Sequence, residues 1–127
     1  MNPETRERAQ RLAEAARDRN GEDVVALDVG PLTSFADAFV LATAASDRQG
    51  RAIADAVREA AKQSGMTLLG TEGYEDGRWI LIDGGDVVVH VFVREAREHY
   101  DLDRLWGDAE HIELPEPTAA AGAARGT

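Results

Sequence analysis

The sequence contains no cysteine, which excludes disulfide bonds, thiolate metal sites and a cysteine nucleophile. It also lacks any run of about 18 apolar residues, the length that a membrane-spanning helix needs. The first ten residues, MNPETRERAQ, are charged and contain no apolar signal region. We therefore expect a cytoplasmic protein that has no membrane partner.

Positive charge is scarce as well, with 14 Lys and Arg against 24 Asp and Glu, for a formal net charge of −10. Proteins that bind nucleic acid through its phosphates need Lys and Arg to displace counterions, so we expect no DNA partner. An acidic chain is suited to a basic protein partner, because charge complementarity raises association rate and specificity. Solubility alone is the simpler explanation of the acidity, and composition does not separate the two.

A length of 127 residues fits one domain. Apolar periodicity, capping residues and turn residues predict three helices and five strands, and the last three strands follow one another through short turns as an antiparallel meander. The fold class is therefore α/β, a mixed sheet of about five strands flanked by helices. We predict helices over residues 3–19, 47–64 and 95–106, and strands over 24–29, 38–42, 66–73, 78–83 and 86–93.

Two segments have more specific signals. Ser46 and Gln49 match a capping box, in which the serine hydroxyl and the glutamine side chain each satisfy a free backbone N–H. From Glu113 on, the prolines, alanines and glycines have nothing to bury. We therefore predict one domain over residues 1–112 and a disordered Pro/Ala/Gly-rich tail over 113–127.

The segment WILIDGGDVVVH, residues 79–90, is the centre of the predicted sheet. Two apolar runs flank Gly84-Gly85, and both central residues of a mirror-type hairpin turn favour positive φ. Strand alternation puts Asp86 and His90 on one face, and Trp79 on the same face as Asp83. The hairpin is thus expected to be buried but to present a few polar groups and one large aromatic side chain.

No catalytic arrangement is visible. Asp86 and His90 are roughly 13 Å apart by strand rise, too far to share one metal ion. The three serines at 34, 46 and 64 lack the context of a nucleophile elbow, and no glycine-rich segment precedes a helix as a phosphate site does. We therefore expect no catalytic residue, no metal and no cofactor.

The aromatic residues suggest binding instead. Trp79 and Trp106 fit either a core or a protein interface, and His90 among valines is more typical of a core position than of a ligand. Trp106 is different because Asp101, Asp103, Asp108 and Glu110 surround it in the sequence, which suits a basic partner surface. Between the first two strands, LTSFAD is explained either by turn chemistry or by a place on a surface.

The segments SFADAFVLAT, SDRQ, EG, WILIDGGDVVVHVF and REHYDLDRLW occur in this order. Together they resemble the Iojap family of bacterial ribosomal silencing factors over about residues 5–110. Four positions depart from the usual pattern of the family. They are Ala44, Gly84, His99 and Asp103.

The resemblance implies a nucleotidyltransferase-like fold without the catalytic motifs. It also implies that the protein binds the fourteenth protein of the large ribosomal subunit, blocks joining of the small subunit, and so represses translation under starvation. Two alternatives are a metal-dependent nucleotidyltransferase-like enzyme and a homodimer that uses the same surface. The residues that we expect to bind the partner, with His90 and Arg97 orienting their neighbours from beneath, are Trp79, Asp83, Asp86, His90, Arg97, Tyr100, Leu102, Leu105 and Trp106.

Overall fold

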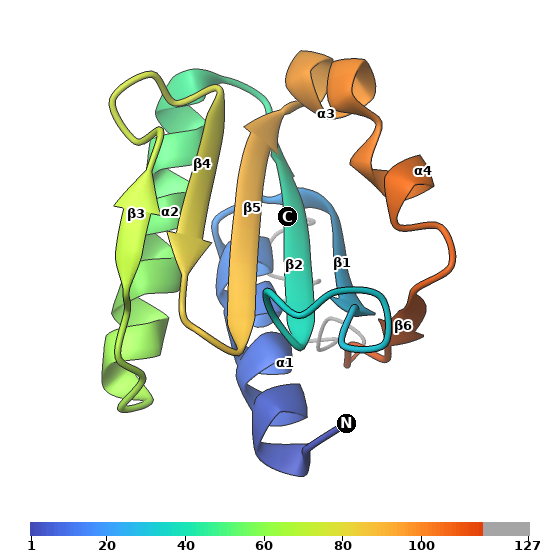
Figure 1. Cartoon of the computed structure of the whole chain (residues 1–127). Helices are drawn as coiled ribbons and strands as arrows, with labels where there is room; N and C mark the ends of the chain where they lie inside the picture. Colours follow the sequence, from blue (N-terminus) through green and yellow to red (C-terminus); the bar gives the residue numbers. More distant parts are fainter. Residues whose placement is uncertain (116–127) are drawn as a thin grey trace.

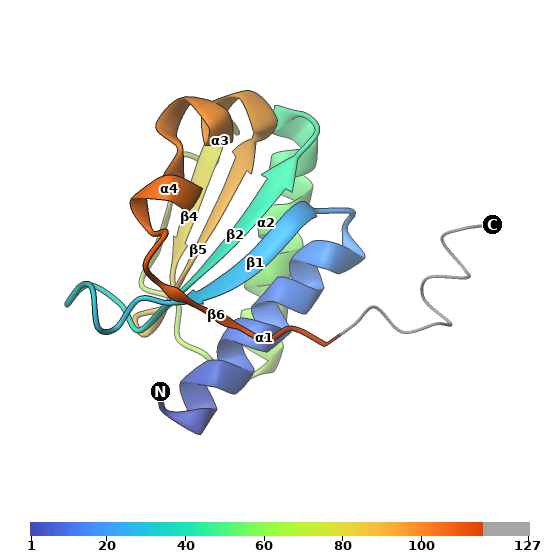
Figure 2. The same ribbon diagram turned by 90° about the vertical axis from the view of Figure 1, so that its right-hand side faces the viewer.

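The computed structural model describes residues 1–115, in which one sheet has two long helices on one of its faces (Figure 1, Figure 2). The predicted α/β class with a mixed, helix-flanked sheet is confirmed, with six strands instead of about five. The elements are α1 (Pro3–Asp18), β1 (Glu22–Asp28), β2 (Ala38–Ala44), α2 (Asp47–Gln63), β3 (Gly70–Glu72), β4 (Trp79–Asp83), β5 (Val87–Val93), α3 (Arg94–Tyr100), α4 (Leu102–Leu105) and β6 (Glu110–Ile112).

The strand order is β3-β4-β5-β2-β1-β6. The strands β3, β4 and β5 form the predicted antiparallel meander. In the middle of the sheet, β5 pairs in parallel with β2, and β1 is antiparallel to both β2 and β6. Because β2 and β5 are parallel, both strands end on the same side of the sheet. The helices that follow them, α2 and α3, therefore begin next to each other at the carboxyl ends of these strands (Figure 1).

Two strands differ from the sequence prediction. The sixth strand, β6, was missed because its three residues, Glu110–Ile112, contain one buried apolar side chain and no apolar run. The third strand is shorter than predicted, since only Gly70–Glu72 of residues 66–73 form it. The side chains of Met66 and Leu68 instead pack against the core from irregular backbone.

The two faces of the sheet bury different sets of side chains. Toward α1 and α2 point alternate residues such as Ile80, Val87 and Val89, which pack with Leu12 and Ile53 of the helices. Residues of the opposite parity point to the other face, where a second apolar cluster contains Phe39 and Phe92 among others. The predicted alternation is therefore confirmed along β4 and β5, but it is wrong for Asp86. As a turn residue, Asp86 points its carboxylate toward α1, whereas His90 lies on the opposite face of the sheet. All seven residues of β2 are buried, as expected for a strand covered on both faces.

Side chains cap both long helices. Asn2 Oδ1 accepts from Glu4 N at 2.8 Å, and Ser46 Oγ accepts from Gln49 N at 3.1 Å. The predicted capping box at Ser46 is only half formed, because the Gln49 carbonyl accepts from Ala45 N instead of from Ser46 N. The amide nitrogen of Gln49 donates to Asn20 O at 3.2 Å, so this side chain also joins the start of α2 to the end of α1.

The turn between β4 and β5 is displaced by one residue from the prediction. Gly84 N donates to Val87 O at 2.9 Å, which makes Gly85 and Asp86 the central residues. Only Gly85 has positive φ, at 85°, the requirement at the first central position of a type II′ turn. Gly84 is therefore the last paired residue of the hairpin and is not a turn residue.

The predicted helix over residues 95–106 is interrupted. Asp101 has a left-handed backbone with φ 48°, which ends α3 and starts α4 in a new direction. Its side chain makes no capping hydrogen bond to α4. The backbone carbonyl of Asp101 instead accepts from Arg104 N and Leu105 N, each at 3.1 Å.

Residues 113–115 pack on α1. Glu113 O accepts from Gln10 Nε2 at 2.7 Å, and Pro115 O accepts from Arg17 at 2.6 Å. Leu114 packs against the core between the sheet and the long helices, which corrects the expectation that nothing is buried after Ile112. The rest of the predicted 113–127 tail lies outside the described residues.

Within residues 1–115, no helix combines the length and the apolarity needed to cross a membrane.

Gly73 gives a test of the turn before β4. Its φ is 78°, and a Cβ there would overlap the carbonyl oxygen of Trp79. We expect Gly73→Ala to lower the free energy of unfolding by about 2 kcal/mol or more, because backbone strain and a backbone clash combine. Urea denaturation measures the change. Gly70→Ala is the control, since no atom lies within 4 Å of its added Cβ, and equal losses in the two variants would contradict the prediction.

Candidate docking surface

The sheet face opposite α1 and α2 carries a connected group of rings. Phe39 meets Trp106 edge-on at 5.0 Å between centroids and His90 at 4.9 Å. Trp79 lies 4.7 Å from Tyr100 and 5.7 Å from Phe92. Aromatic pairs at such distances stabilise each other beyond their buried area. We call this set the aromatic face, and its members are Phe39, Trp79, His90, Phe92, Tyr100 and Trp106.

Trp79 and His90 are joined at the centre of this face. The indole Nε1–H donates to His90 Nδ1 at 3.1 Å, across the pair of strands β4 and β5. The bond requires Nδ1 without a proton, so the neutral ring carries its hydrogen on Nε2. His90 is 7% exposed, and its Nε2 has no hydrogen-bond partner within residues 1–115. The histidine therefore orients Trp79 from beneath.

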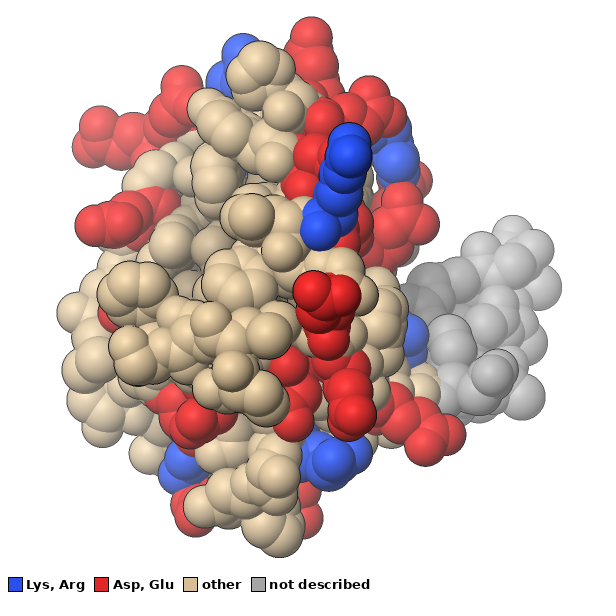
Figure 3. Space-filling view, turned by 45° about the vertical axis from the view of Figure 1, so that its right-hand side comes forward, with Lys and Arg blue, Asp and Glu red and all other residues tan. Residues whose placement is uncertain are grey.

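The rim of the aromatic face is apolar and open. Tyr100 is 53% exposed and Leu105 is 67% exposed, whereas Leu102 is buried in the cluster below. Trp79 and Trp106 are half-buried. Figure 3 shows a broad uncharged area on this side of the molecule, with many acidic and a few basic side chains along its border. The surface thus combines large apolar groups with negative charge, the combination expected of a contact site for a basic protein.

Arg97 of α3 lies under this surface and contacts residues of α4, β1, β2 and β5. It is 7% exposed, and its guanidinium makes a two-bond pair with the carboxylate of Asp103, at 2.8 and 2.9 Å. The remaining nitrogen donates to Asp23 O at 2.8 Å and to Thr43 Oγ1 at 2.7 Å. The same guanidinium lies 5.7 Å from the ring centre of Phe92. Arg97 therefore fixes α4 against β1 and β2.

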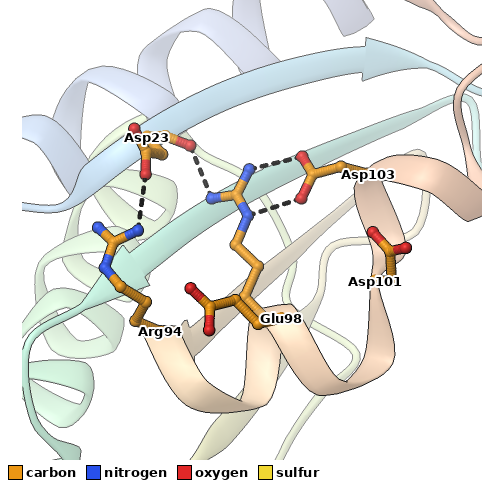
Figure 4. A pocket seen from close by; sticks show the side chains of 6 residues that line it. Asp23, Arg94, Glu98, Asp101 and Asp103 are labelled. Carbon is orange, nitrogen blue, oxygen red and sulfur yellow. Dashed lines mark hydrogen bonds and ion pairs between the residues drawn. The ribbon is translucent and has the colours of Figure 1, made fainter.

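A cavity of about 360 Å³ surrounds this arginine and is lined almost entirely by charged groups (Figure 4). The Arg97 pair lowers the pKa of Asp103, chiefly through hydrogen bonding. Glu98 and Asp101 take no part in the ion pairs formed within residues 1–115. Most of the polar groups in the cavity are thus used to hold α3 and α4, and they form a support for the aromatic face.

Asp83 and Asp86 lie apart from the aromatic face. Asp83 Oδ1 accepts from Gly85 N at 2.9 Å within the hairpin turn. Asp86 Oδ2 accepts from Thr5 Oγ1 at 2.8 Å and from Arg8 at 2.9 Å, so its carboxylate faces α1. The structure therefore brings Trp79, His90 and the α3–α4 residues together and places the two turn aspartates elsewhere.

The four positions that depart from the family pattern have identifiable contacts. Asp103 forms the pair with Arg97, and His99 packs edge-on against Tyr100 at 5.0 Å. Ala44 is buried at the end of β2. A Cβ at Gly84 would lie 2.9 Å from Val87 O and 3.3 Å from Met66. Asp103 and His99 thus lie next to the aromatic face, whereas Gly84 lies at the far end of the hairpin.

Sequence reasoning did not select Phe35, the most exposed of the large apolar side chains described, at 84%. It lies in the loop between β1 and β2, in the segment for which turn chemistry and a surface role were both open. The available signal was a phenylalanine between Pro31 and Asp37, flanked by polar residues and outside any alternating pattern. Large aromatic residues in such loops have no strand partner to pack against.

The polar side chains under this face are bonded to one another. Within residues 1–115, no group of three or more His, Asp and Glu side chains is placed to hold a metal ion. The buried His90 is bonded to Trp79, and the buried Arg97 is bonded to Asp103. The exposed groups include rings, a leucine, carboxylates and the side chain of Arg104, which suit apolar and electrostatic contacts with another macromolecule.

Acid should destabilise the protein through His90. Burial lowers the pKa of His90 to about 4, whereas in the unfolded chain it is about 6.5. Between these values the unfolded chain binds the extra proton, so the stabilisation present above pH 6.5 is lost as the pH falls toward 4. The loss is about 3 kcal/mol. Urea denaturation across this range checks it against His90→Asn, which keeps an acceptor for Trp79 but does not titrate. An identical pH dependence in both proteins would rule this out.

Comparisons with known proteins agree on one family. The family described as "Ribosomal silencing factor during starvation" matches residues 2–127. A ribosomal silencing factor of Chromobacterium violaceum is 39% identical over 122 residues, covering 96% of this chain and 95% of the relative. That of Bacillus subtilis is 41% identical over 102 residues, covering 80% and 86%. The chloroplastic protein Iojap of Arabidopsis thaliana is 38% identical over 108 residues, covering 84% of this chain and 44% of the relative.

Solved structures give the same result. A crystal structure of a protein from Chromobacterium violaceum matches with a TM-score of 0.79 and 38% identity, covering 98% of both chains. A crystal structure from Bacillus halodurans matches with a TM-score of 0.70 and 40% identity, covering 81% of this chain and 94% of that chain. The resemblance inferred from the separated motifs is therefore confirmed over nearly the whole sequence. The chain belongs to the ribosomal silencing factor family.

Proposed function

We propose that this protein binds the large ribosomal subunit through the fourteenth protein of that subunit and sterically prevents the small subunit from joining. By this action it represses translation in the cytoplasm when nutrients are scarce. Membership of the ribosomal silencing factor family gives the general role. The observation that supports a docking mechanism most directly is the open aromatic face, with Tyr100 and Leu105 exposed at its rim.

The aromatic face has the composition of a protein-binding surface. Binding energy in protein interfaces is concentrated in Trp, Tyr and Arg side chains near the centre, and apolar neighbours exclude water around them. Trp79, Tyr100 and Trp106 provide such groups, each already in contact with another ring. The rings lose little freedom on binding, which leaves more of the contact energy for affinity.

Electrostatics favours a basic partner. The chain has a net charge of −10, and acidic side chains border the uncharged area in Figure 3. Ribosomal proteins must contact RNA phosphates, so their surfaces are generally rich in Lys and Arg. Opposite charge raises the association rate and orients the two surfaces before the apolar groups meet.

A steric mechanism needs only position and affinity. The protein has a mass of 13.7 kDa and a rigid six-stranded sheet. If such a body occupies the face of the large subunit that meets the small subunit, the two subunits cannot approach each other. No chemical step is required, in keeping with a surface of apolar and acidic groups.

Subunit joining is the direct test. We expect purified small and large ribosomal subunits to form intact ribosomes on a sucrose gradient in magnesium buffer, and to remain separate when the protein is added first. The added protein should migrate with the large subunit. Normal formation of intact ribosomes at saturating protein would refute the proposal. Migration with the small subunit alone would refute the assignment of the partner.

The rim residues provide a sharper prediction. We expect Leu105→Ala and Trp106→Ala each to weaken binding to large subunits by about 30-fold, or about 2 kcal/mol, because each removes an apolar group from the docking surface. Cosedimentation across a range of protein concentrations measures the affinity. The matched control is Leu69→Ala, since Leu69 is 68% exposed and directly precedes the edge strand β3. Wild-type affinity of the folded Trp106→Ala protein would remove Trp106 from the contact region.

A further inference from the structure

We infer that the loop between β1 and β2, residues 30–37, is a second arm of the docking surface, and that Phe35 inserts into an apolar site bordered by Lys and Arg on the partner. The inference rests on the proposed function, because the partner in question is the basic protein surface of the large ribosomal subunit. It extends the contact region beyond the aromatic face to a residue far from α3 and α4 in sequence.

The loop is held at both ends, so the exposure of Phe35 does not reflect loose backbone. At the base of the loop, Val29 N and Gly30 N both donate to Asp37 O, at 3.0 and 3.2 Å. Asp37 N donates in turn to Asp86 O at 2.9 Å, which ties the loop to the hairpin turn. Near the tip, Phe35 N donates to Thr33 Oγ1 at 3.2 Å. An exposed ring on a fixed backbone is prepared for binding, because little ordering is needed on contact.

Phe35 is more exposed than any other large apolar side chain within residues 1–115, at 84%, and Leu32 of the same loop is 46% exposed. By contrast, the adjacent Ala36 is buried in the cluster beneath the aromatic face. The chain therefore turns one small apolar residue inward and leaves the large ring in solvent. A phenylalanine in this position buries little of its side chain in the isolated protein.

The loop projects on the same side of the sheet as α4, away from α1 and α2 (Figure 1, Figure 2). Four residues after Phe35, Phe39 contacts both Trp106 and His90. The aromatic face therefore begins where the loop re-enters the sheet, at the start of β2. A partner that covers Trp106 and Leu105 on one side is positioned to meet Phe35 on the other.

The charge around the loop specifies the kind of partner. No Lys or Arg occurs from Gly21 to Asp47, a segment that contains five acidic residues. At the base of the loop, the carboxylates of Asp28 and Asp37 both face Gly30, whose added Cβ would lie 3.5 and 3.6 Å from them. A second copy of this acidic chain would meet like charge here. A basic protein surface with an apolar site for one ring meets opposite charge.

The test compares Phe35→Ala with Leu69→Ala in the full-length protein. Leu69 is 68% exposed and immediately precedes β3, at the opposite edge of the sheet from β1 and β6. We expect Phe35→Ala to weaken cosedimentation with purified large ribosomal subunits by about tenfold or more, and Leu69→Ala to leave the affinity within about twofold of wild type. Thermal melting should show equal stability, because neither side chain is buried.

The outcomes separate the inference from the proposed function. If Leu105→Ala weakens binding but Phe35→Ala does not, the loop lies outside the contact and the inference is wrong, although the proposed function stands. If wild-type protein does not bind large subunits, both are wrong. Equal losses in Phe35→Ala and Leu69→Ala would show non-specific adhesion and also overturn the inference. A Phe35→Ala protein that binds subunits normally but shifts from dimer to monomer in analytical ultracentrifugation would assign the loop to self-association instead.

Discussion

The parallel pairing of β2 with β5 is the interaction on which the rest of the structure depends. It runs the full length of both strands, from Ala38 opposite Val87 to Ala44 opposite Val93. Because parallel strands end at one edge, α2 and α3 both begin there, and only α2 turns back with α1 to cover the sheet. The seven-residue α3 and the short α4 cover only part of the opposite face. The exposure of Tyr100 and Leu105 at the rim of the aromatic face follows from this one-sided coverage.

Two buried polar residues hold the partly exposed side chains of the aromatic face in place. His90 holds the indole of Trp79 by one hydrogen bond. Arg97 connects α4 to β1 and β2 through the carboxylate of Asp103, the backbone oxygen of Asp23 and the hydroxyl of Thr43. Burial has a cost for each group. It makes protonation of the His90 ring unfavourable, and it removes water from the charged Arg97 guanidinium. Both residues lie directly beneath the aromatic face, where they fix the positions of the large side chains that we propose to contact the partner.

Local signals predicted most of the fold. The meander, the alternation along β4 and β5 and the two long helices follow from apolar periodicity, glycine and capping residues within short windows. The errors arise where distant residues decide the outcome: β6 exists only because β1 offers a free edge, and Asp86 faces Arg8, 78 positions earlier. The sequence selected Trp79, Tyr100 and Trp106 as candidate contacts, and the structure brings them together, but the sequence selected none of the three phenylalanines, Phe35, Phe39 and Phe92. An exposed ring in a loop has no periodic neighbours and can be recognised only when its surroundings are known.

The acidity of the chain, which composition alone explained as a means of solubility, has a second consequence once the structure is considered. An exposed apolar surface promotes self-association, and like charge around it opposes that association. The same carboxylates attract a basic protein surface, so one charge distribution both discourages self-association and favours the partner. Selectivity for a basic partner over a second copy of the chain then does not require any catalytic or cofactor site. It requires that Tyr100 and Leu105 remain open to solvent while acidic groups border the surface around them, and that is the arrangement in the structure.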